Sequence, residues 1–407
     1  MIKHFHIDNF KSLVDFRLNP AGGSLAKFTC LVGLNGAGKS TVLQALDFVG
    51  HLASGEIEKY LNAREWKPSD MLSKFASRKQ LISFEVGLDL GFDEDVIWKA
   101  AYNTSQDRCT SEEVLLGTKR QLRLQAGELV YQSREPLFTG KAQLDERLSI
   151  GKLKQSGSSL SLLKVESLGP VLAKLKAFTE TLKSLDMLSP QSMRKRAREG
   201  SDIGYNGERL SAFIHGMSVL RRKLLLSDLQ TFYPRLESLE TRAVKAGWKD
   251  LSFAEGYLDA DGKPMVSSAR HINDGLLRVL AVLAEVQPAS EPTGDGHSNR
   301  GCVLFDEIEN GINPELVRGL VDFLRTASPQ VIVTTHSPMI LNYLPDDEAR
   351  RAVLLIYRNT LGHTQAVRFF DQPSANERLG LLGPGEVFVD VDLRKLSAQA
   401  AEQASVA

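Results

Sequence analysis

The chain has 407 residues, of which 42% are hydrophobic and 25% are charged, as is typical of a globular protein with room for more than one domain. Lys and Arg together number 50, as do Asp and Glu, so the formal net charge is zero. This balance excludes a general attraction of the whole chain to nucleic acid, and any such contact would need a local basic patch.

The cysteines and the N-terminal residues indicate a cytoplasmic protein. Cys30, Cys109 and Cys302 form no CxxC pair and no zinc-binding spacing, which favours a reducing compartment over a disulfide scaffold. The first residues lack the apolar core of a signal peptide, and no run approaches about 20 consecutive apolar residues. We therefore expect no membrane span.

The first 50 residues predict two strands and a helix. Ile2–Ile7 and the apolar run Phe28–Val32 have the length of short strands, and the second has the composition of a buried one. A glycine-rich turn follows Phe28–Val32, and Ser40–Val49 then predicts a helix.

The segment 51–249 has a different pattern and is predicted to be an insertion. Its first half favours an antiparallel sheet, because short turns join its strands, expected at Leu81–Leu90, Val96–Tyr102 and Gln121–Tyr131 with a turn at Ala126–Gly127. Its second half is predicted to be mainly helical, with helices at Leu210–Leu226 and Leu229–Ala246 and a basic interruption at Ser184–Gly207.

The C-terminal part returns to alternating strands and helices. Asp274–Val286 is apolar on most sides and predicts a buried helix, and Gln287–Arg300 is a polar loop. Core strands are expected at Cys302–Phe305 and Val331–Thr335, late edge strands at Val353–Arg358 and Ala366–Phe370, and a frayed tail at Ser397–Ala407. We thus expect one nucleotide-binding domain built from residues 1–50 and 250–390, with a tail at 391–407.

A phosphate-binding loop is predicted at Gly33–Ser40, which matches the pattern GxxxxGK[ST] between a strand and a helix. Its glycines allow the backbone N–H groups to form an anion nest, and the following helix adds the positive end of its dipole. In this reading Lys39 reaches the β- and γ-phosphates of a nucleotide and Ser40 ligates Mg²⁺. The alternative is a glycine turn that carries Lys-Ser by chance.

An acidic pair, Asp306 and Glu307, ends the apolar strand Cys302–Phe305. Ligands of open α/β sheets bind at the carboxyl ends of strands, so we assign Asp306 to Mg²⁺ and Glu307 to the general base that orients an attacking water. The alternative is a strand that ends at the surface in two solvated acids. His336, which follows Val331–Thr335, can reach a terminal phosphate or be a capped loop histidine.

These motifs, in this order, resemble the ATP-binding-cassette (ABC) class of P-loop ATPases, and within it the RecF/SMC-like branch that includes OLD-type and anti-phage defence ATPases. The resemblance rests on Asn9–Ser12, the Walker A loop Gly33–Ser40, the signature-like His271–Arg278, the Walker B strand Val303–Glu307, the D-loop-like Glu309–Pro314 and the switch histidine His336. It implies a mixed α/β sheet with helices on both faces, interrupted by an inserted lobe.

The resemblance also implies two heads that bury two ATP molecules between them. ATP and Mg²⁺ are the expected ligands, held by Gly33, Asn35, Gly36, Ala37, Gly38, Lys39, Ser40 and Thr41 of one head and by Asn273, Asp274 and Gly275 of the other. Asn273 departs from the serine usual in this signature, and it is either a trans contact or only a helix cap. The glutamine of the Q-loop is assigned to Gln80.

The expected function is ATP binding and hydrolysis by a homodimer that acts on DNA or in anti-phage defence. No nuclease pattern follows His336, so a separate nuclease or other effector is expected. The basic clusters Arg194–Arg198 and Arg221–Lys223 are either phosphate contacts or solvated helix faces. The alternatives are a low-turnover ATP sensor and, because of the long insertion less favoured, the nucleotide-binding subunit of a transporter.

Overall fold

A computed structural model describes residues 1–19, 23–76, 80–134, 143–150, 156–185, 189–287 and 301–406. The predicted polar loop after the buried helix lies, apart from Gln287, outside the described residues.

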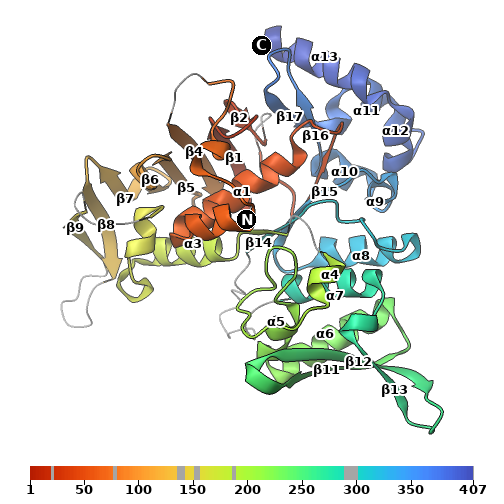
Figure 1. Cartoon of the computed structure of the whole chain (residues 1–407). Coiled ribbons are helices and arrows are strands. Elements are labelled where there is room, and N and C mark those ends of the chain that lie inside the picture. Colours follow the sequence, from red (N-terminus) through yellow and green to blue (C-terminus); the bar gives the residue numbers. More distant parts are fainter. Residues whose placement is uncertain are drawn as a thin grey trace.

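A six-stranded sheet forms the centre of the molecule (Figure 1). Its strands, in spatial order, are β10 (Lys183–Leu185), β14 (Cys302–Phe305), β15 (Gln330–Thr334), β3 (Phe28–Val32), β16 (Val353–Arg358) and β17 (Thr364–Arg368). All neighbours are parallel except β16 and β17. This sheet has the predicted mixed architecture. The prediction of two late edge strands is only half correct, because β16 is an interior strand and β17 lies at the edge.

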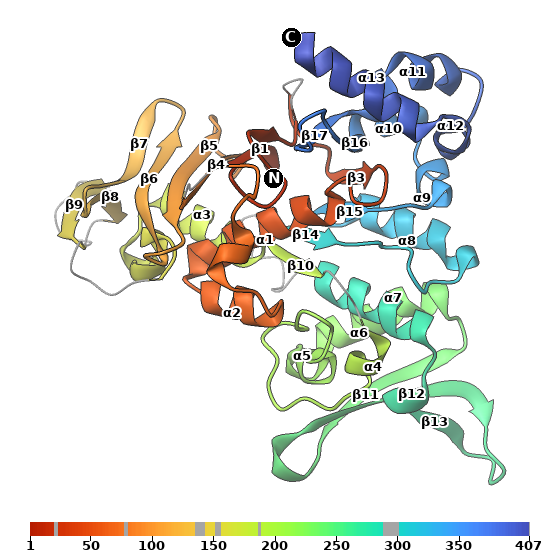
Figure 2. The same cartoon turned by 45° about the horizontal axis from the view of Figure 1, so that its top comes forward.

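Helices cover both faces of this sheet, which explains why its interior strands β14, β15, β3 and β16 are mostly apolar and buried. Alternate residues of β3 enter different clusters: Cys30 belongs to the cluster that includes α7 (Asp274–Val286) and α8 (Pro314–Thr326), whereas Leu31 belongs to the cluster that includes α1 (Lys39–Ser54). The helix that follows the glycine-rich loop and the predicted buried helix therefore lie on opposite faces of the sheet. Figure 2 shows α1 and α7 separated in this way.

A second, eight-stranded antiparallel sheet projects from the centre. The insertion pattern predicted an antiparallel sheet, but two of its strands come from residues 2–17, outside the predicted insertion. Its strands, in spatial order, are β2 (Phe16–Arg17), β1 (Ile2–Asp8), β4 (Leu81–Leu88), β5 (Val96–Asn103), β6 (Arg108–Leu116), β7 (Lys119–Gln125), β8 (Glu128–Arg134) and β9 (Gln143–Ser149). The turn at Ala126–Gly127 is confirmed, because Gln125 pairs with Glu128. Strand β6 was not predicted because of its acidic residues, of which Glu112 is buried and accepts hydrogen bonds from Trp98 and Ser159.

The helical prediction for Leu229–Ala246 is wrong. Helix α6 (Val219–Phe232) ends before Pro234, whose ring disfavours helical backbone in the preceding residue. Strand β11 (Leu236–Ala243) follows, and with β12 (Lys249–Leu258) and β13 (Pro264–Ser268) it forms a three-stranded antiparallel sheet. The prediction for Leu210–Leu226 spans two helices, α5 (Leu210–Gly216) and α6, with Ser218 as the N-cap of the second.

The C-terminal segment is helical, so the expectation of a frayed tail is wrong. Helix α13 (Leu393–Val406) buries Leu396, Ala400 and Ala401 against the core, and the Tyr357 hydroxyl donates to the carbonyl of Ala400. The sequence misled because this apolar face consists largely of alanine. The predicted domain division stays a prediction, although β10 belongs to the predicted insertion and still pairs with β14 in the central sheet.

The other helices lie around these sheets. They are α2 (Ile57–Ala63), α3 (Pro170–Glu180), α4 (Pro190–Met193), α9 (Pro338–Asn342), α10 (Asp346–Ala352), α11 (Pro373–Leu379) and α12 (Pro384–Asp390).

Gly50 allows α1 to approach the chain segment before β10. A Cβ at this position would lie 2.3 Å from the carbonyl oxygen of Leu182. We expect Gly50→Ala to lower the free energy of unfolding by about 1–3 kcal/mol, because overpacking outweighs the helix propensity gained. Urea denaturation measures this. Gly216→Ala is the control, because nothing lies within 4 Å of its Cβ position. Equal stabilisation of both variants would contradict the close approach.

Candidate functional site

The carboxyl ends of four parallel strands bring the predicted nucleotide motifs to one edge of the central sheet. At this edge, Asp306 and Glu307 follow β14, His336 follows β15, and the glycine-rich loop follows β3. Gln191 is in the next described segment after β10. Segments distant in sequence thus become neighbours, since β14 pairs with β15 and β15 pairs with β3.

The loop Gly33–Gly38 has the open backbone that a phosphate cradle requires. Gly33 and Gly38 have φ angles of 145° and 109°, and a Cβ on Gly33 would lie 2.1 Å from the Ile356 carbonyl oxygen. The Lys39 ammonium is buried beneath the loop and donates to the carbonyls of Gly33 and Leu34, at 3.0 and 3.3 Å. Burial lowers the pKa of Lys39, while Asp306, Glu307 and Glu309 oppose this shift.

The loop is supported by residues from both ends of the chain. Thr364 in β17 donates its hydroxyl to the Ala37 carbonyl at 2.8 Å and also bonds to the Ser12 hydroxyl. The Arg358 guanidinium donates to the Gly36 carbonyl at 2.8 Å. Within the loop, Asn35 and Gly36 remain exposed. In the first turn of α1, Ser40 and Thr41 are half-buried.

Thr334 holds the acidic pair in place. Its hydroxyl donates to the Asp306 carboxylate at 2.5 Å and accepts from the Glu307 backbone N–H at 2.8 Å. Glu307 has a φ of 47°, which is unfavourable for a non-glycine residue and which the surrounding structure must maintain. Its side chain is exposed at the end of β14, whereas Asp306 is half-buried.

Glu309 connects the acidic segment to His336. One oxygen of its carboxylate accepts from the His336 backbone N–H at 2.8 Å, while Oε2 is buried without a hydrogen-bond partner among the described residues. The His336 side chain is exposed. A buried, unsatisfied carboxylate oxygen next to a lysine and an acidic pair fits a site completed by a ligand with its metal ion.

A cavity of about 340 Å³ joins Asp306 and Glu307 to Gln191 and Arg278. Gln191 was not predicted, and it lies in α4, the next described element after edge strand β10. The sequence signal that could have identified Gln191 is the short run Lys183–Leu185, a possible strand before Ser189-Pro190-Gln191. From the sequence alone, this region is interpreted only as a basic interruption. The assignment to Gln80 is not supported by its contacts, because its side chain accepts from Thr104 and Ser105 at the turn after β5.

The signature-like turn lies away from this cavity, at the N-terminus of α7. Asn273 caps the helix, with its side-chain oxygen accepting from Leu276 N–H at 2.8 Å, and it is exposed. Asp274 pairs with Arg194 at 2.5 Å, and Gly275 lies beside the carbonyl of Gly311. None of Asn273, Asp274 and Gly275 lines the cavity around Asp306 in the described part of the chain.

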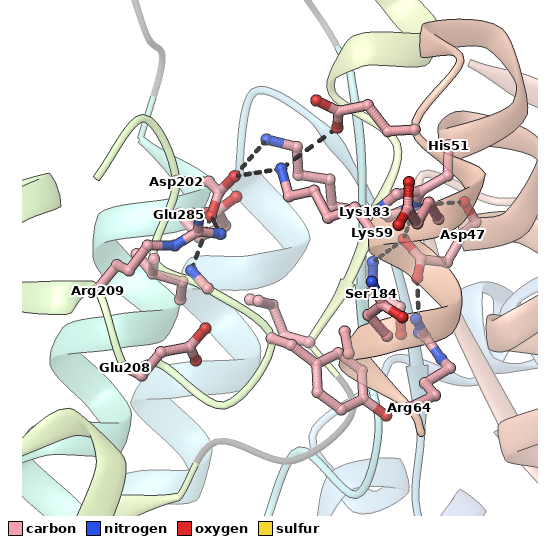
Figure 3. A pocket seen from close by; sticks show the side chains of 18 of the residues that line it. Asp47, His51, Lys59, Arg64, Lys183, Ser184, Asp202, Glu208, Arg209 and Glu285 are labelled. Atoms are coloured by element: carbon pink, nitrogen blue, oxygen red, sulfur yellow. Dashed lines mark hydrogen bonds and ion pairs between the residues drawn. The ribbon is translucent and has the colours of Figure 1, made fainter. Parts of the chain in front are cut away.

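A larger cavity, of about 720 Å³, lies between α1, α2, β10 and the C-terminal end of α7 (Figure 3). At one side Asp202 faces the cations of Lys59, Lys183 and Arg209. At the other, the buried Asp47 of α1 pairs with Arg64 at 2.6 Å and with His51 at 3.3 Å, and it accepts from the Ser184 N–H. Asp47 therefore fastens the loop-bearing helix to the edge strand that precedes Gln191.

The fold is that of an ABC-class P-loop head of the RecF/SMC-like type. The chain belongs to the family described as "AAA domain, putative AbiEii toxin, Type IV TA system", whose model matches residues 28–342. A second model, described as "AAA domain", matches residues 4–50. No curated protein sequence matches the chain.

One solved structure supports this fold at low sequence identity, and two further solved structures are similar with lower TM-scores. An SMC head bound to the C-terminal winged-helix domain of ScpA is 14% identical, with a TM-score of 0.53 over 90% of this chain and 97% of that one. The SMC head domain from Thermotoga maritima is 10% identical, with a TM-score of 0.45 over 90% and 98%. RecF with ATP is 11% identical, with a TM-score of 0.41 over 90% and 99%.

Two predictions are therefore confirmed: the resemblance to this class of P-loop ATPases and the fold class. In addition, no helix in the described ranges combines the length and the apolar composition needed to cross a membrane.

The Asp47 network predicts a pH-dependent stability. Burial opposes the charge on His51, but its hydrogen bond to Asp47 prevails and raises the pKa of His51 above its usual value. The contribution of protonated His51 is therefore complete below about pH 6.5 and is lost as the pH rises through the raised folded-state pKa. We expect His51→Gln to lower the free energy of unfolding by about 1 kcal/mol more at pH 6 than at pH 9. Urea titrations at both pH values measure the difference, and an equal effect would contradict it.

Proposed function

We propose that this chain binds ATP with Mg²⁺ at the carboxyl edge of the central sheet, forms a head-to-head homodimer around two ATP molecules, and hydrolyses them. The observation that supports this most is the convergence of Lys39, after β3, with Asp306 and Glu307, after β14, on either side of β15. Beside them, a buried carboxylate oxygen of Glu309 has no hydrogen-bond partner among the described residues.

In the proposed complex, the loop residues Gly33–Thr41 bind the phosphates through backbone N–H groups. Lys39 exchanges its bonds to the loop carbonyls for bonds to phosphate oxygens. Ser40 and Asp306 hold Mg²⁺, which would neutralise charge on the phosphates. Thr334 keeps Asp306 oriented through its hydroxyl.

Glu307 is proposed as the general base. Its exposed carboxylate follows directly on Asp306, and its backbone is held by Thr334, so the side chain is directed away from the strand. Gln191 and Arg278 line the same cavity, where the amide can position a water molecule and the guanidinium can balance charge. His336 is exposed at the adjacent strand end and is proposed to contact the terminal phosphate.

Dimerisation is proposed because α1 and α7 lie on opposite faces of the sheet, so the turn Asn273–Gly275 needs a nucleotide from another subunit. Asn273 uses its side-chain oxygen as a cap and retains an amide donor for such a contact. The exposure of Asn273 and Asp274 supports this role.

We further propose that a separate effector, such as a nuclease, works with this head in DNA repair or anti-phage defence. The SMC head in the solved complex is bound to a domain of another protein, ScpA, and a head without a nuclease pattern would likewise act through a partner. A low-turnover ATP sensor is the alternative. Turnover that a partner or DNA does not change would favour the sensor.

The test of dimerisation uses Glu307→Gln, which keeps ATP binding while removing the base. We expect its mass to double when ATP and Mg²⁺ are added, because nucleotide held without hydrolysis keeps the heads closed. Light scattering after size exclusion measures this. Lys39→Ala, which removes the phosphate contact, should stay monomeric under the same conditions. A Glu307→Gln mass that ignores ATP would count against the scheme.

Gln191 provides a second test. We expect Gln191→Ala to lower kcat by about tenfold or more while ATP affinity changes little, since the residue acts beside the acidic pair rather than at the loop. Phosphate release and equilibrium nucleotide binding separate the two effects. Gln80→Ala is the matched control and should keep wild-type turnover; the reverse pattern would return the assignment to Gln80.

A further inference from the structure

A basic groove of about 740 Å³ lies beside the signature-like turn. Its lining residues come from the segment after α4, from the turn between β11 and β12, and from the turn before α7, and they are Arg194, Lys195, Arg196, Val244, Lys245, Trp248 and Arg270. Five of these seven side chains are cationic and none is acidic. In a chain with zero net charge, this is a strong local excess.

The nearby acids neutralise only part of this charge. Asp274 pairs with Arg194, and Asp250 accepts two hydrogen bonds from Arg196, each at 3.0 Å. No ion pair among the described residues includes Lys195, Lys245 or Arg270, and all three are exposed. Lys195 and Lys245 thus face solvent beside Arg270, whose charge helps to lower the pKa of Asp250, and the cations outnumber the acids around one depression. Such a local excess favours an anionic ligand.

The groove also presents an aromatic ring. Trp248 is 38% exposed, and the guanidinium of Arg198 lies 4.8 Å from its ring centroid. An exposed tryptophan among cations is suited to stack an unpaired base while the cations contact the backbone phosphates. A single phosphate ion would use the charges but not the ring.

The backbone here is fixed, so the groove is a preformed surface. Ala197 N–H donates to the Ser211 hydroxyl at 3.0 Å, and Lys249 N–H donates to the Ala197 carbonyl at 2.7 Å. The second basic cluster of the sequence differs: Arg221 donates to the carbonyls of Ala284 and Gln287 and so fixes the end of α7. Arg221 is thus engaged within the fold, whereas Lys195 and Arg198 of the first cluster are exposed.

We propose that this groove binds single-stranded nucleic acid, with Lys195, Lys245 and Arg270 on the phosphates and Trp248 stacked on a base. Arg194 also donates to the Ile272 carbonyl at 2.7 Å, so the bound strand lies next to the turn that carries Asn273. The inference deepens the proposed action on DNA by naming the surface. It does not require ATP turnover.

The test measures binding of fluorescein-labelled 20-nucleotide oligothymidylate and oligouridylate to the full-length protein by anisotropy, between about 50 and 200 mM salt. Changing Lys195, Lys245 and Arg270 together to Glu should weaken binding by more than about tenfold and reduce the slope of log K against log salt by about 2. Trp248→Ala should weaken it by about tenfold, and Trp248→Phe should retain most of it.

Matched controls separate this site from general charge effects. Changing the exposed Lys119, Arg318 and Arg351 together to Glu alters the net charge equally and should leave the affinity within about twofold of wild type. Lys39→Ala should keep oligonucleotide binding even if ATP binding is lost. A failure of the proposed ATPase scheme can therefore be distinguished from a failure of the proposed nucleic-acid groove.

Four outcomes would overturn the proposal. The first two are no oligonucleotide binding by the wild type at low salt, and a loss of affinity in the control triple variant as large as in the groove triple variant. The other two are an affinity for a duplex of the same length equal to that for the single strand, and displacement of the labelled oligonucleotide by a polyglutamate peptide as effective as displacement by unlabelled oligonucleotide. The last would indicate an acidic protein partner in the groove instead.

Discussion

The site depends on one geometric constraint: parallel strands in one sheet end at the same edge. Because β10, β14, β15 and β3 run in the same direction, the four segments that follow them meet without any direct connection in sequence. The central residues of β3, β14 and β15 are buried and mostly apolar, so the charged residues of the site appear only where these strands stop. The same rule that buries Val331–Val333 thus places His336 beside the loop that begins at Gly33.

Hydrogen bonds at this edge fix the positions of the residues that follow the strands. Thr334 is the last residue of β15, yet it bonds to residues that follow β14, and this cross-strand contact sets the backbone of Glu307. The loop is held from the far side by Thr364 and Arg358. A phosphate cradle of flexible glycines therefore lies between two supports whose positions the sheet determines.

Much of this could be predicted from the sequence, since the motifs at Gly33–Ser40 and Val303–Glu307 have fixed spacing and a fixed relation to their strands. The predicted helix Asp274–Val286 and the strands Phe28–Val32 and Cys302–Phe305 were confirmed residue for residue. Where the prediction failed, local patterns were ambiguous. Pro234 ended a helix whose periodicity seemed to continue, and the three residues of β10 were too few to show a period, so Gln191 was overlooked. The roles of the individual site residues depend on a nucleotide and remain predictions.

The placement of β3 has a consequence for how the chain is made. This strand is synthesised well before its partners β15 and β16, which span Gln330–Thr334 and Val353–Arg358. Until most of the protein has been synthesised, Phe28–Val32 is an apolar segment with both edges unpaired. The nascent chain must keep that segment from associating elsewhere, and α1 can cover only the face that carries Leu31, because Phe28, Cys30 and Val32 pack in the cluster formed with later elements.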